Sequence, residues 1–421
     1  MVNIAAGIVV MRAYRIMLAE KVGSEMQKTP GGVPISDLDP FTVEAIREGQ
    51  AFDGRLREMA PVIYLPQYDI YVVGRHDEVH TVAGDWRNYS NKSRPFHDPN
   101  SIRPEILLNF DPPEHARVGT VIQKVLSPAA MNRMRDIFVN AADELVDRLL
   151  ANGPAEVNGH VDVAAAYVLK AFPDAIGLPQ EGRHHLLHFS DAVFNTFGPP
   201  NDIFLRGLER GAGAIAYVEA NCKRETLTPG GLGAAMYDAV DRGTVTEEEG
   251  ELLVKTMYAA GADTTILGIG SLLRAFAEFP EQWEVLKKDP SLSRQAFEEI
   301  LRYECPARFG GRITAREVEI QGLRVPGGAR MMMLWMAAGR DPRRWENADQ
   351  YDLNRKLSGH VGMGYGIHAC VGASLARFEG ECIFAALARK VDRIELIGEP
   401  QPAINMAAHG YDELPIRLHP A

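Results

Sequence analysis

A run of glycines around a single cysteine, near the carboxyl end of the 421-residue chain, most restricts what this sequence can fold around. Gly362, Gly364, Gly366 and Gly372 flank Cys370, and a helical pattern begins directly after the cysteine. Glycine permits positive φ angles and, without a Cβ, lets the backbone approach a flat ligand. A thiolate at a helix N-terminus is stabilised by free N–H groups and by the helix dipole. This combination suits a sulfur bound to an iron above a planar macrocycle, while a glycine-rich turn with a buried cysteine is the simpler alternative.

The decapeptide from Met363 to Gly372, Met-Gly-Tyr-Gly-Ile-His-Ala-Cys-Val-Gly, resembles the haem-binding loop of the cytochrome P450 family, Phe-Gly-x-Gly-x-His-x-Cys-x-Gly. Met363 stands where the family usually has phenylalanine, a departure that concerns the packing beside the sulfur and not the iron ligand. The resemblance implies that haem b is the cofactor and that Cys370 is the axial ligand of its iron. It also implies that His368 contacts a haem propionate and that Gly364 and Gly372 belong to the cofactor-binding loop.

Composition and charge narrow the class of protein. The chain is 46% hydrophobic and 24% charged, which is ordinary for a globular protein with a large core. Its formal net charge of −11 disfavours nucleic acid and anionic membrane surfaces as partners. The four cysteines, Cys222, Cys305, Cys370 and Cys382, show no paired metal spacing and are too sparse for a disulfide framework. We therefore expect a cytoplasmic protein.

The chain is expected to form one domain. An apolar run over residues 4–18 is interrupted by Arg12 and Arg15 and is shorter than a bilayer span, so no membrane anchor is expected. We interpret residues 1–25 as a loosely attached N-terminal extension. Residues 26–421 are interpreted as a single catalytic domain, because no linker or internal repeat divides them.

The residue patterns predict a mainly α-helical fold with small β-sheets. Short β-branched and aromatic runs predict a hairpin over 62–73, strands at 308–315, 318–320 and 331–335, and a final strand pair over 394–415. Apolar periodicity predicts helices over 132–150, 161–176, 182–197, 202–225 and 371–391, and one long helix over 246–279. By resemblance, this is the single-domain cytochrome P450 fold, with a long central helix over the haem and the cysteine loop beneath it.

The segment Asp111-Pro112-Pro113-Glu114-His115-Ala116-Arg117 carries a second resemblance. We expect Asp111 to cap a helix whose first turn contains the two prolines. The segment resembles the family's C-helix, which implies that His115 binds a haem propionate. Gly119 stands where the family often has a basic residue, so one propionate is less well neutralised or Arg117 takes over that role. A surface or core histidine is the alternative for His115.

The middle of the predicted long helix contains Ala259-Ala260-Gly261-Ala262-Asp263-Thr264-Thr265. A buried acid and two β-branched alcohols are costly inside an apolar helix. One interpretation is a kink, in which a threonine hydroxyl bonds back to a helix carbonyl. The other matches the family's acid–alcohol pair, in which Thr264 hydrogen bonds to O₂ in a groove and Asp263 supplies protons through water. The two interpretations can coexist, and the resemblance favours a catalytic role.

Two further marks lie between the long helix and the cysteine loop. Glu299 and Arg302 share one helix face, and the Glu-x-x-Arg spacing resembles the family's buried ion pair behind the haem, which is structural and not catalytic. A surface salt bridge is the alternative. Arg312 occupies the place of the family's propionate-binding arginine.

The resemblance implies a haem-thiolate monooxygenase, which inserts one oxygen atom of O₂ into a C–H bond or removes an alkyl group from an ether. Electrons are expected from NAD(P)H through external redox partners, an iron-sulfur ferredoxin and a flavin-dependent ferredoxin reductase. The ferredoxin is expected to dock on the Cys370 face near Arg377. A haem-based ligand sensor is the non-enzyme alternative. Asp263 and Thr264 argue against it, because binding alone needs no proton relay.

Segments 172–178 and 194–200 resemble the bacterial subgroup that oxidises or O-demethylates para-substituted benzoic acids. The resemblance implies that Phe194 and Phe197 flank an aromatic ring and that Arg103 anchors a carboxylate. We therefore expect a small aromatic substrate, a para-substituted benzoic acid in preference to a neutral phenol ether. A terpenoid or another secondary metabolite is the alternative.

Two departures from this subgroup concern the pocket. Ala259 stands where the subgroup has a serine near the carboxylate, and Gly310-Gly311 stand where it has aromatic bulk. These changes allow a larger pocket or a neutral substrate.

Overall fold

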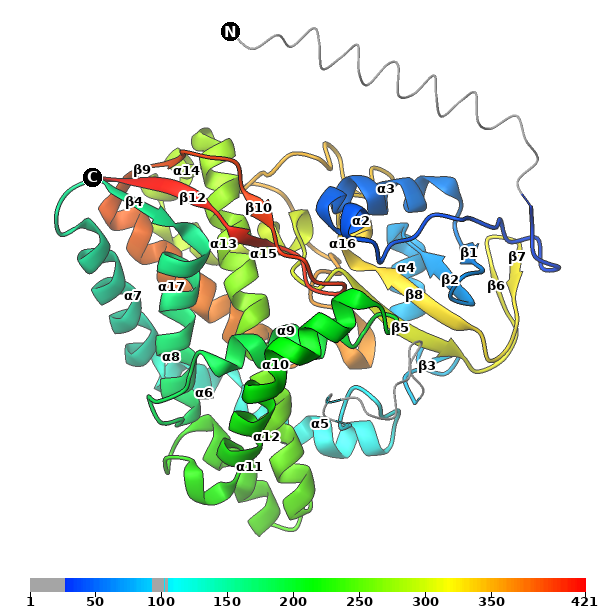
Figure 1. Ribbon diagram of the computed structural model, residues 1–421, viewed down its shortest axis with the longest axis horizontal. Coiled ribbons are helices and arrows are strands. Elements are labelled where there is room, and N and C mark those ends of the chain that lie inside the picture. The colour runs from blue at the N-terminus through cyan, green and yellow to red at the C-terminus, as the bar shows by residue number, and fades with distance from the viewer. Residues whose placement is uncertain (1–26, 93–101, 103–104) are drawn as a thin grey trace, which may run out of the picture.

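The computed structural model describes residues 27–92, 102 and 105–421. The interpreted extension over 1–25 and the carboxylate anchor Arg103 lie outside the described residues. The described chain forms a helix-rich part and a smaller part built on a β-sheet, side by side (Figure 1). This architecture confirms the predicted mainly helical fold with small sheets. Among the described residues, none of the helices is both long and apolar enough to cross a membrane.

A five-stranded sheet in the order β1-β2-β8-β5-β3 organises the smaller part. Its strands are β1 (Ile63–Leu65), β2 (Ile70–Val73), β3 (Tyr89–Ser90), β5 (Phe309–Thr314) and β8 (Arg330–Leu334). The predicted hairpin is confirmed, because β1 and β2 pair antiparallel. β8 joins β2 in parallel and β5 antiparallel, so it links the first hairpin to the later strands. Four helices accompany the sheet: α2 (Val43–Glu48), α3 (Gln50–Met59), α4 (His76–Gly84) and α16 (Trp335–Gly339).

Smaller sheets lie outside this unit. β12 (Pro415–Pro420) lies between β4 (Ala155–Asn158) and β9 (Val391–Leu396), which closes the chain onto the helical part. Two hairpins complete the strands: β6 (Val318–Ile320) with β7 (Leu323–Val325), and β10 (Gln401–Pro402) with β11 (Tyr411–Glu413).

The larger part is built from helices that mostly match the predicted ones. They are α5 (Glu114–Val125), α6 (Pro128–Arg133), α7 (Arg135–Leu150), a π-helix (Gly159–Ala165), α8 (Ala166–Ile176), α9 (His185–Asn195), α10 (Asp202–Asn221), α11 (Leu232–Asp241), α12 (Glu247–Gly261), α13 (Asp263–Glu278), α14 (Pro280–Lys288), α15 (Ser293–Tyr303) and α17 (Ala373–Lys390). Single turns of tighter helix occur at Arg224–Thr226, Pro290–Leu292 and Gly366–His368.

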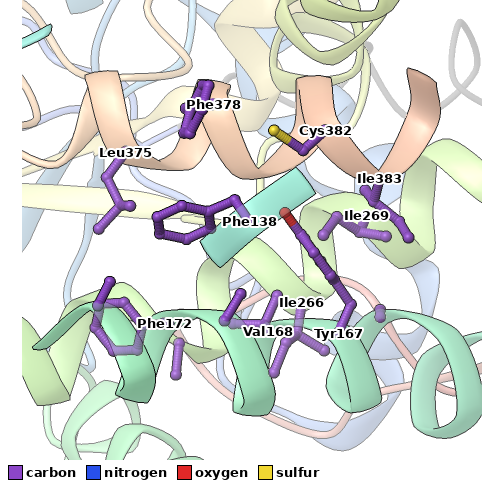
Figure 2. Packing of buried hydrophobic residues seen from close by; sticks show 14 of the residues in the cluster. Phe138, Tyr167, Val168, Phe172, Ile266, Ile269, Leu375, Phe378, Cys382 and Ile383 are labelled. Carbon is purple, nitrogen blue, oxygen red and sulfur yellow. The ribbon is translucent and has the colours of Figure 1, made fainter. Parts of the chain in front are cut away.

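The main apolar core joins α17, which follows the cysteine loop, to α7, α8 and α13. In Figure 2, Phe138 of α7 lies between α17 above it and α8 below it. Its ring meets that of Phe378 edge-on, with 5.4 Å between the centroids. Phe138 and Phe172 are almost completely buried. Burial of such rings stabilises the fold by about 1.5–3 kcal/mol each and fixes α17 relative to the helices that surround the cavity described below.

The prediction of one long helix over 246–279 is wrong in one respect, because the structure divides this segment into α12 and α13 at Ala262. Thr264 Oγ1 donates to the Ala260 carbonyl at 2.8 Å, and Thr265 Oγ1 donates to the Gly261 carbonyl at 3.3 Å. These hydroxyls compete with backbone N–H groups for the same carbonyls, which bends helices. A Cβ at Gly261 would lie 2.4 Å from the Phe172 ring, so α8 packs directly against the break.

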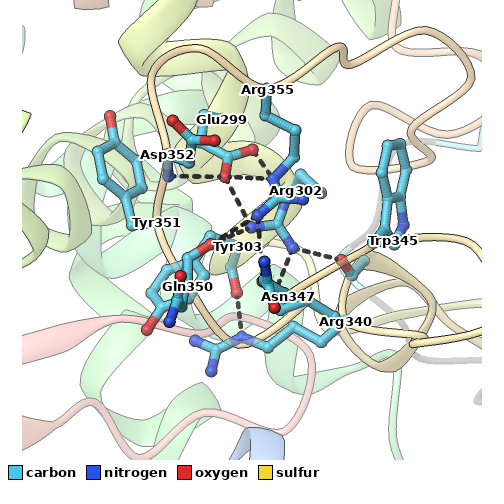
Figure 3. A network of polar contacts seen from close by, with 12 residues as sticks. Glu299, Arg302, Tyr303, Arg340, Trp345, Asn347, Gln350, Tyr351, Asp352 and Arg355 are labelled. Atoms are coloured by element: carbon cyan, nitrogen blue, oxygen red, sulfur yellow. Dashed lines mark hydrogen bonds and ion pairs between the residues drawn. The ribbon is translucent and has the colours of Figure 1, made fainter.

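Glu299 and Arg302 form a fully buried ion pair, with Nη2 and Oε1 2.7 Å apart (Figure 3). The Arg302 guanidinium also donates to the carbonyl oxygens of Gly339, Ala348 and Gln350, at 2.8–2.9 Å. The predicted pair is therefore present, and it anchors the irregular segment that precedes the cysteine loop. Buried donors and acceptors that find partners of this kind avoid a large desolvation cost.

Candidate functional site

A cavity of about 370 Å³ lies between the break in the central helix, strand β5 and the glycine-rich loop. Most of its lining is apolar. The residues predicted for the site that line it are His115, Phe194, Phe197, Thr264, Arg312, Gly364, His368, Cys370 and Gly372. Asp263, Glu299 and Arg302 do not line it. One cavity thus brings together residues from five separate stretches of sequence.

The glycine-rich loop holds Cys370 against the cavity. The backbone N–H of Cys370 donates to the Met363 carbonyl at 2.7 Å and closes the loop. Gly364 and Gly366 have φ angles of 69° and 74°, which strongly favour glycine. A Cβ at Gly366 would also lie 2.9 Å from the Ala83 carbonyl oxygen, so the loop approaches α4 too closely for a side chain. The loop conformation therefore depends on the glycines that the sequence places there.

The environment of the Cys370 sulfur has opposing effects on its ionisation. Burial raises the pKa of the Cys370 thiol, whereas a hydrogen bond from the Gly372 backbone N–H and the charge of Arg377 lower it. Arg377 forms an ion pair with Glu298, and His360 Nε2 lies 2.9 Å from the same carboxylate. N–H groups and a cation near a sulfur suit a thiolate ligand.

Three nitrogen-bearing side chains converge on one edge of the cavity. Arg312 Nη1 donates to the Asn91 side chain at 2.9 Å and to the Gly311 carbonyl at 2.8 Å. The Arg312 Nε and both ring nitrogens of His368 are buried and form no hydrogen bond with the described residues. The His368 ring lies 4.4 Å from that of His115, centroid to centroid. Burial lowers the pKa of Arg312 to about 10 and that of His368 to about 3.

These residues fit a haem group. Buried N–H donors without acceptors are costly, and a carboxylate supplies two oxygens that accept such hydrogen bonds. The unpaired nitrogens of Arg312 and His368 therefore match the propionates, while Cys370 offers a sulfur ligand to the same cavity. Cys370 would hold the iron, and His115, Arg312 and His368 would hold the propionate edge.

Asp111 does not cap α5, so that prediction is wrong. Its carboxylate accepts hydrogen bonds from Ser90 Oγ at 2.5 Å and from the Asn91 backbone N–H at 3.2 Å. Its Oδ1 lies 4.0 Å from His368 Nε2. Asp111 therefore ties strand β3 to the cavity edge, and Asn91 positions Arg312. No periodic pattern indicates this role, because β3 has only two residues.

Arg117 does not reach the propionate edge. Its guanidinium forms two hydrogen bonds with Glu249, Nη2–Oε1 at 2.5 Å and Nη1–Oε2 at 2.9 Å, at the N-terminus of α12. Gly119 packs near the His115 ring and Leu107. The prediction that Arg117 neutralises a propionate in place of the missing basic residue at Gly119 is therefore wrong. His115 is the one basic side chain of α5 that lines the cavity.

Asp263 and Thr264 differ in their surroundings. Thr264 lines the cavity, whereas Asp263 is only 9% exposed and does not line it. Burial, followed by the nearby carboxylates of Asp191 and Asp412, raises the pKa of Asp263 to about 8. Asp191 is paired with Arg210, at 2.6 Å between Oδ2 and Nη2. Asp263 thus retains a proton at neutral pH next to the helix break.

The wall contributed by α9 and by the turn that follows it is aromatic. The Phe194 and Phe197 rings both line the cavity, with centroids 5.9 Å apart and planes inclined by 30°. Ala259 lies in the lining as well. A Cβ at Gly310 would lie 2.8 Å from the Trp335 ring, so this indole covers the space beside the first of the two glycines. The aromatic bulk missing at Gly310 is therefore supplied by a residue that the sequence patterns did not indicate.

Comparison with known proteins extends these observations. A family model described as Cytochrome P450 matches residues 232–392. Cytochrome P450 CYP199A2 of Rhodopseudomonas palustris is 43% identical over 400 residues, covering 93% of this chain and 96% of the relative. The steroid C26-monooxygenase of Rhodococcus jostii is 27% identical over 404 residues, covering 91% of this chain and 84% of the relative. The solved structure of cytochrome P450 CYP109Q5 from Chondromyces apiculatus superimposes with a TM-score of 0.77 at 27% identity, covering 91% of this chain and 98% of that one.

The similarity spans nearly the whole chain and includes both the helical part and the glycine-rich loop. Haem is the cofactor of this family, and bacterial members like CYP199A2 receive electrons from NAD(P)H through external redox partners. O₂ and an organic substrate are its reactants. The chain belongs to the cytochrome P450 family of haem-thiolate monooxygenases.

Proposed function

We propose that this monooxygenase hydroxylates or O-demethylates a small aromatic substrate, a para-substituted benzoic acid in preference to a neutral phenol ether. The observation that carries this proposal is the pair of phenyl rings, Phe194 and Phe197, in a largely apolar cavity that also exposes Cys370. Aromatic rings pack favourably against each other in tilted and edge-on arrangements. A flat substrate ring held by these phenyl groups would lie in the same cavity that would hold the haem.

The acid preference depends on Arg103. Arg312 is the only lysine or arginine among the described residues that line the cavity, and its Nη1 already donates to Asn91 and Gly311. An acidic substrate therefore needs a further cation, and the resemblance of this chain to benzoate-oxidising enzymes assigns that role to Arg103. Arg103 itself lies outside the described residues.

The reaction depends on the haem and on the residues that line the cavity. Haem, when bound, supplies the activation of O₂, one atom of which enters the substrate while the other leaves as water after uptake of two electrons and two protons. Cys370 would provide the thiolate ligand of the iron, with Gly364 and Gly372 shaping its loop, and His115, Arg312 and His368 would hold the propionates. Thr264 holds a proton at Oγ1 facing the cavity, and Asp263, its neighbour in α13, stores one at its carboxyl group outside the cavity lining.

The electron donors are proposed to be an iron-sulfur ferredoxin and a flavin-dependent ferredoxin reductase. Arg377, on the helix that follows Cys370, is a suitable contact for an acidic ferredoxin because its side chain is partly exposed. The four cysteines are free in the structure, in keeping with a cytoplasmic protein.

A spectral titration of the ferric holoprotein tests the substrate class. We expect 4-methoxybenzoic acid to shift the haem band to its high-spin position and 4-methoxytoluene, its neutral counterpart, to have little effect. Turnover with ferredoxin, reductase and NAD(P)H should then release 4-hydroxybenzoic acid and formaldehyde. A shift with the neutral compound alone would contradict the acid preference and favour the phenol ether.

The variant Arg103→Ala tests the carboxylate anchor. We expect weaker binding of the acid and unchanged binding of neutral aromatics. Arg117→Ala is a matched control, because it removes another arginine whose guanidinium is bound to Glu249 outside the cavity. Equal affinity of the wild type and Arg103→Ala for 4-methoxybenzoic acid would refute this assignment.

A further inference from the structure

Trp335 has a buried indole with an unused hydrogen-bond donor. It is the first residue of α16, is 8% exposed and lines the cavity. Its Nε1 forms no hydrogen bond with the described residues and, unlike Arg312 Nε, is not fully enclosed by them, so it opens to the cavity that the indole lines. By contrast, Trp283 Nε1 donates to the Asp392 carbonyl at 3.0 Å, and Trp345 Nε1 donates to the Ala338 carbonyl at 3.3 Å. Since buried tryptophans usually satisfy their N–H, the donor of Trp335 calls for an acceptor inside the cavity.

The position of this donor follows from its contact with Gly310. A Cβ built on Gly310 would lie 2.9 Å from Trp335 Nε1 and 2.8 Å from Cζ2 of the same indole. The nitrogen-bearing edge of the indole therefore lies over the glycine, which itself lines the cavity. Even an alanine at Gly310 would displace it. Gly310 thus creates the space that the indole nitrogen occupies.

Gly310 and Arg312 lie on the same face of strand β5. Residues two apart on a strand point to the same side, at about 6.6–6.8 Å along it. The pairing of β5 with β8 is regular here, with Gly310 opposite Met333 and Arg312 opposite Met331. The edge of the indole is therefore one strand repeat from Arg312, whose Nε is the unpaired donor assigned to a haem propionate.

We propose that Trp335 Nε1–H donates a hydrogen bond to a haem propionate beside Arg312, and that Trp335 is therefore a cofactor-holding residue of this enzyme. A neutral donor is useful here because α5 offers no basic side chain at Gly119 and Arg117 is bound to Glu249. A propionate carboxylate has more acceptor positions than the donors of Arg312 and His368 fill. Trp335 supplies a donor without a second cation near Arg312.

The variant Trp335→Phe tests the proposal, because it keeps an aromatic ring and removes the N–H. In the substrate-free ferric holoprotein, the rate of haem transfer to an excess of apomyoglobin should rise roughly tenfold, as expected for the loss of a hydrogen bond to a charged group. Trp283→Phe is the matched control, since it deletes an indole N–H remote from the cavity, and it should leave the transfer rate unchanged. Trp335→Gln, which restores an N–H donor, should recover part of the retention.

Haem whose propionates are converted to methyl esters separates the carboxylate contact from a general packing effect. The wild type and Trp335→Phe should lose the esterified haem at nearly equal rates, because it has no anionic acceptor. The propionate bending bands in the resonance Raman spectrum should shift only with ordinary haem. The proposal would be overturned if Trp335→Phe lost ordinary haem at the wild-type rate. It would also be overturned if the variant lost ordinary and esterified haem faster than the wild type by the same factor. Weaker binding of oxygen-bearing substrates alone would instead assign the donor to the substrate.

Discussion

Asp263 and Thr264 are adjacent in the sequence, yet only Thr264 lines the cavity beside Cys370. Both residues open α13 after the break at Ala262, and successive side chains of a helix project about 100° apart, so the alcohol faces the cavity and the acid lies near Asp191 and Asp412. A buried acid next to further carboxylates holds its proton to a higher pH. The pair therefore consists of a hydroxyl that lines the cavity and a protonated acid that lies behind the lining.

Asp263→Asn should change how stability depends on pH. The pKa of Asp263 is about 8 in the folded protein against 3.8 ordinarily, so the folded state binds more protons between these values. Stability contributed by the protonated acid is full below pH 4 and is lost as pH rises towards 8. Asparagine carries no such loss. We expect the unfolding free energy of Asp263→Asn to gain on the wild type from pH 5 to pH 8 in urea titrations. A constant difference over this range would contradict the raised pKa.

Thr264→Ala should uncouple electron use from product formation. The hydroxyl faces the cavity and now donates to the Ala260 carbonyl, so its removal leaves the helix break without the group assigned to hold a proton there. General acid–base groups contribute about 10²–10⁴-fold to rates. We expect NAD(P)H consumption to continue while product per NAD(P)H falls. Thr264→Ser, which keeps the hydroxyl, should restore most of the yield, and full coupling in Thr264→Ala would refute the assignment.

Arg302→Met should cost about 3–5 kcal/mol of unfolding free energy, because it leaves the Glu299 carboxylate buried without its main partner. Arg355 Nε also contacts Glu299, at 3.0 Å, and would retain part of the network. Lys170→Ala provides the contrast, since the Lys170 side chain is half exposed and its loss should cost at most about 1 kcal/mol. Urea unfolding of the two variants would measure both values. Equal costs would contradict a structural role for the buried pair.

Much of the fold and of the cavity edge could be predicted because their signals are local. The glycine-rich loop, the helix after Cys370 and the hairpin over 62–73 each depend on residues that are close in sequence. Distant contacts could be predicted only in part or not at all. The kink with threonine back-bonding, one of the two interpretations of the central helix, is confirmed, but the packing of Phe172 of α8 on Gly261 could not be predicted, because no window of the central helix contains that ring.

Distant contacts also account for the two wrong predictions at the cavity. Asp111 precedes two prolines, which is typical of a helix cap, but its carboxylate instead accepts hydrogen bonds from Ser90 of the two-residue strand β3 and from Asn91, which follows it. Gly310-Gly311 indicated open space, yet the indole of Trp335, from the end of the neighbouring strand, covers Gly310. The sequence shows that a bulky side chain is missing at a position. It does not show that a side chain from another element fills the same space.

Glu298→Gln should raise the reduction potential of the haem iron. The Glu298 carboxylate pairs with Arg377, and the charge of Arg377 lowers the pKa of the Cys370 thiol. With glutamine, Arg377 keeps its charge without the compensating anion, which adds net positive charge near the iron ligand and favours the reduced state. Arg377→Gln should act in the opposite direction and lower the potential.

Redox titration with small mediators measures both potentials without a ferredoxin, so that docking effects do not enter. Glu319→Gln, on the hairpin strand β6, is a charge-matched control and should leave the potential unchanged. Shifts of the same sign in Glu298→Gln and Arg377→Gln would show that the pair affects the iron through structure and not through charge.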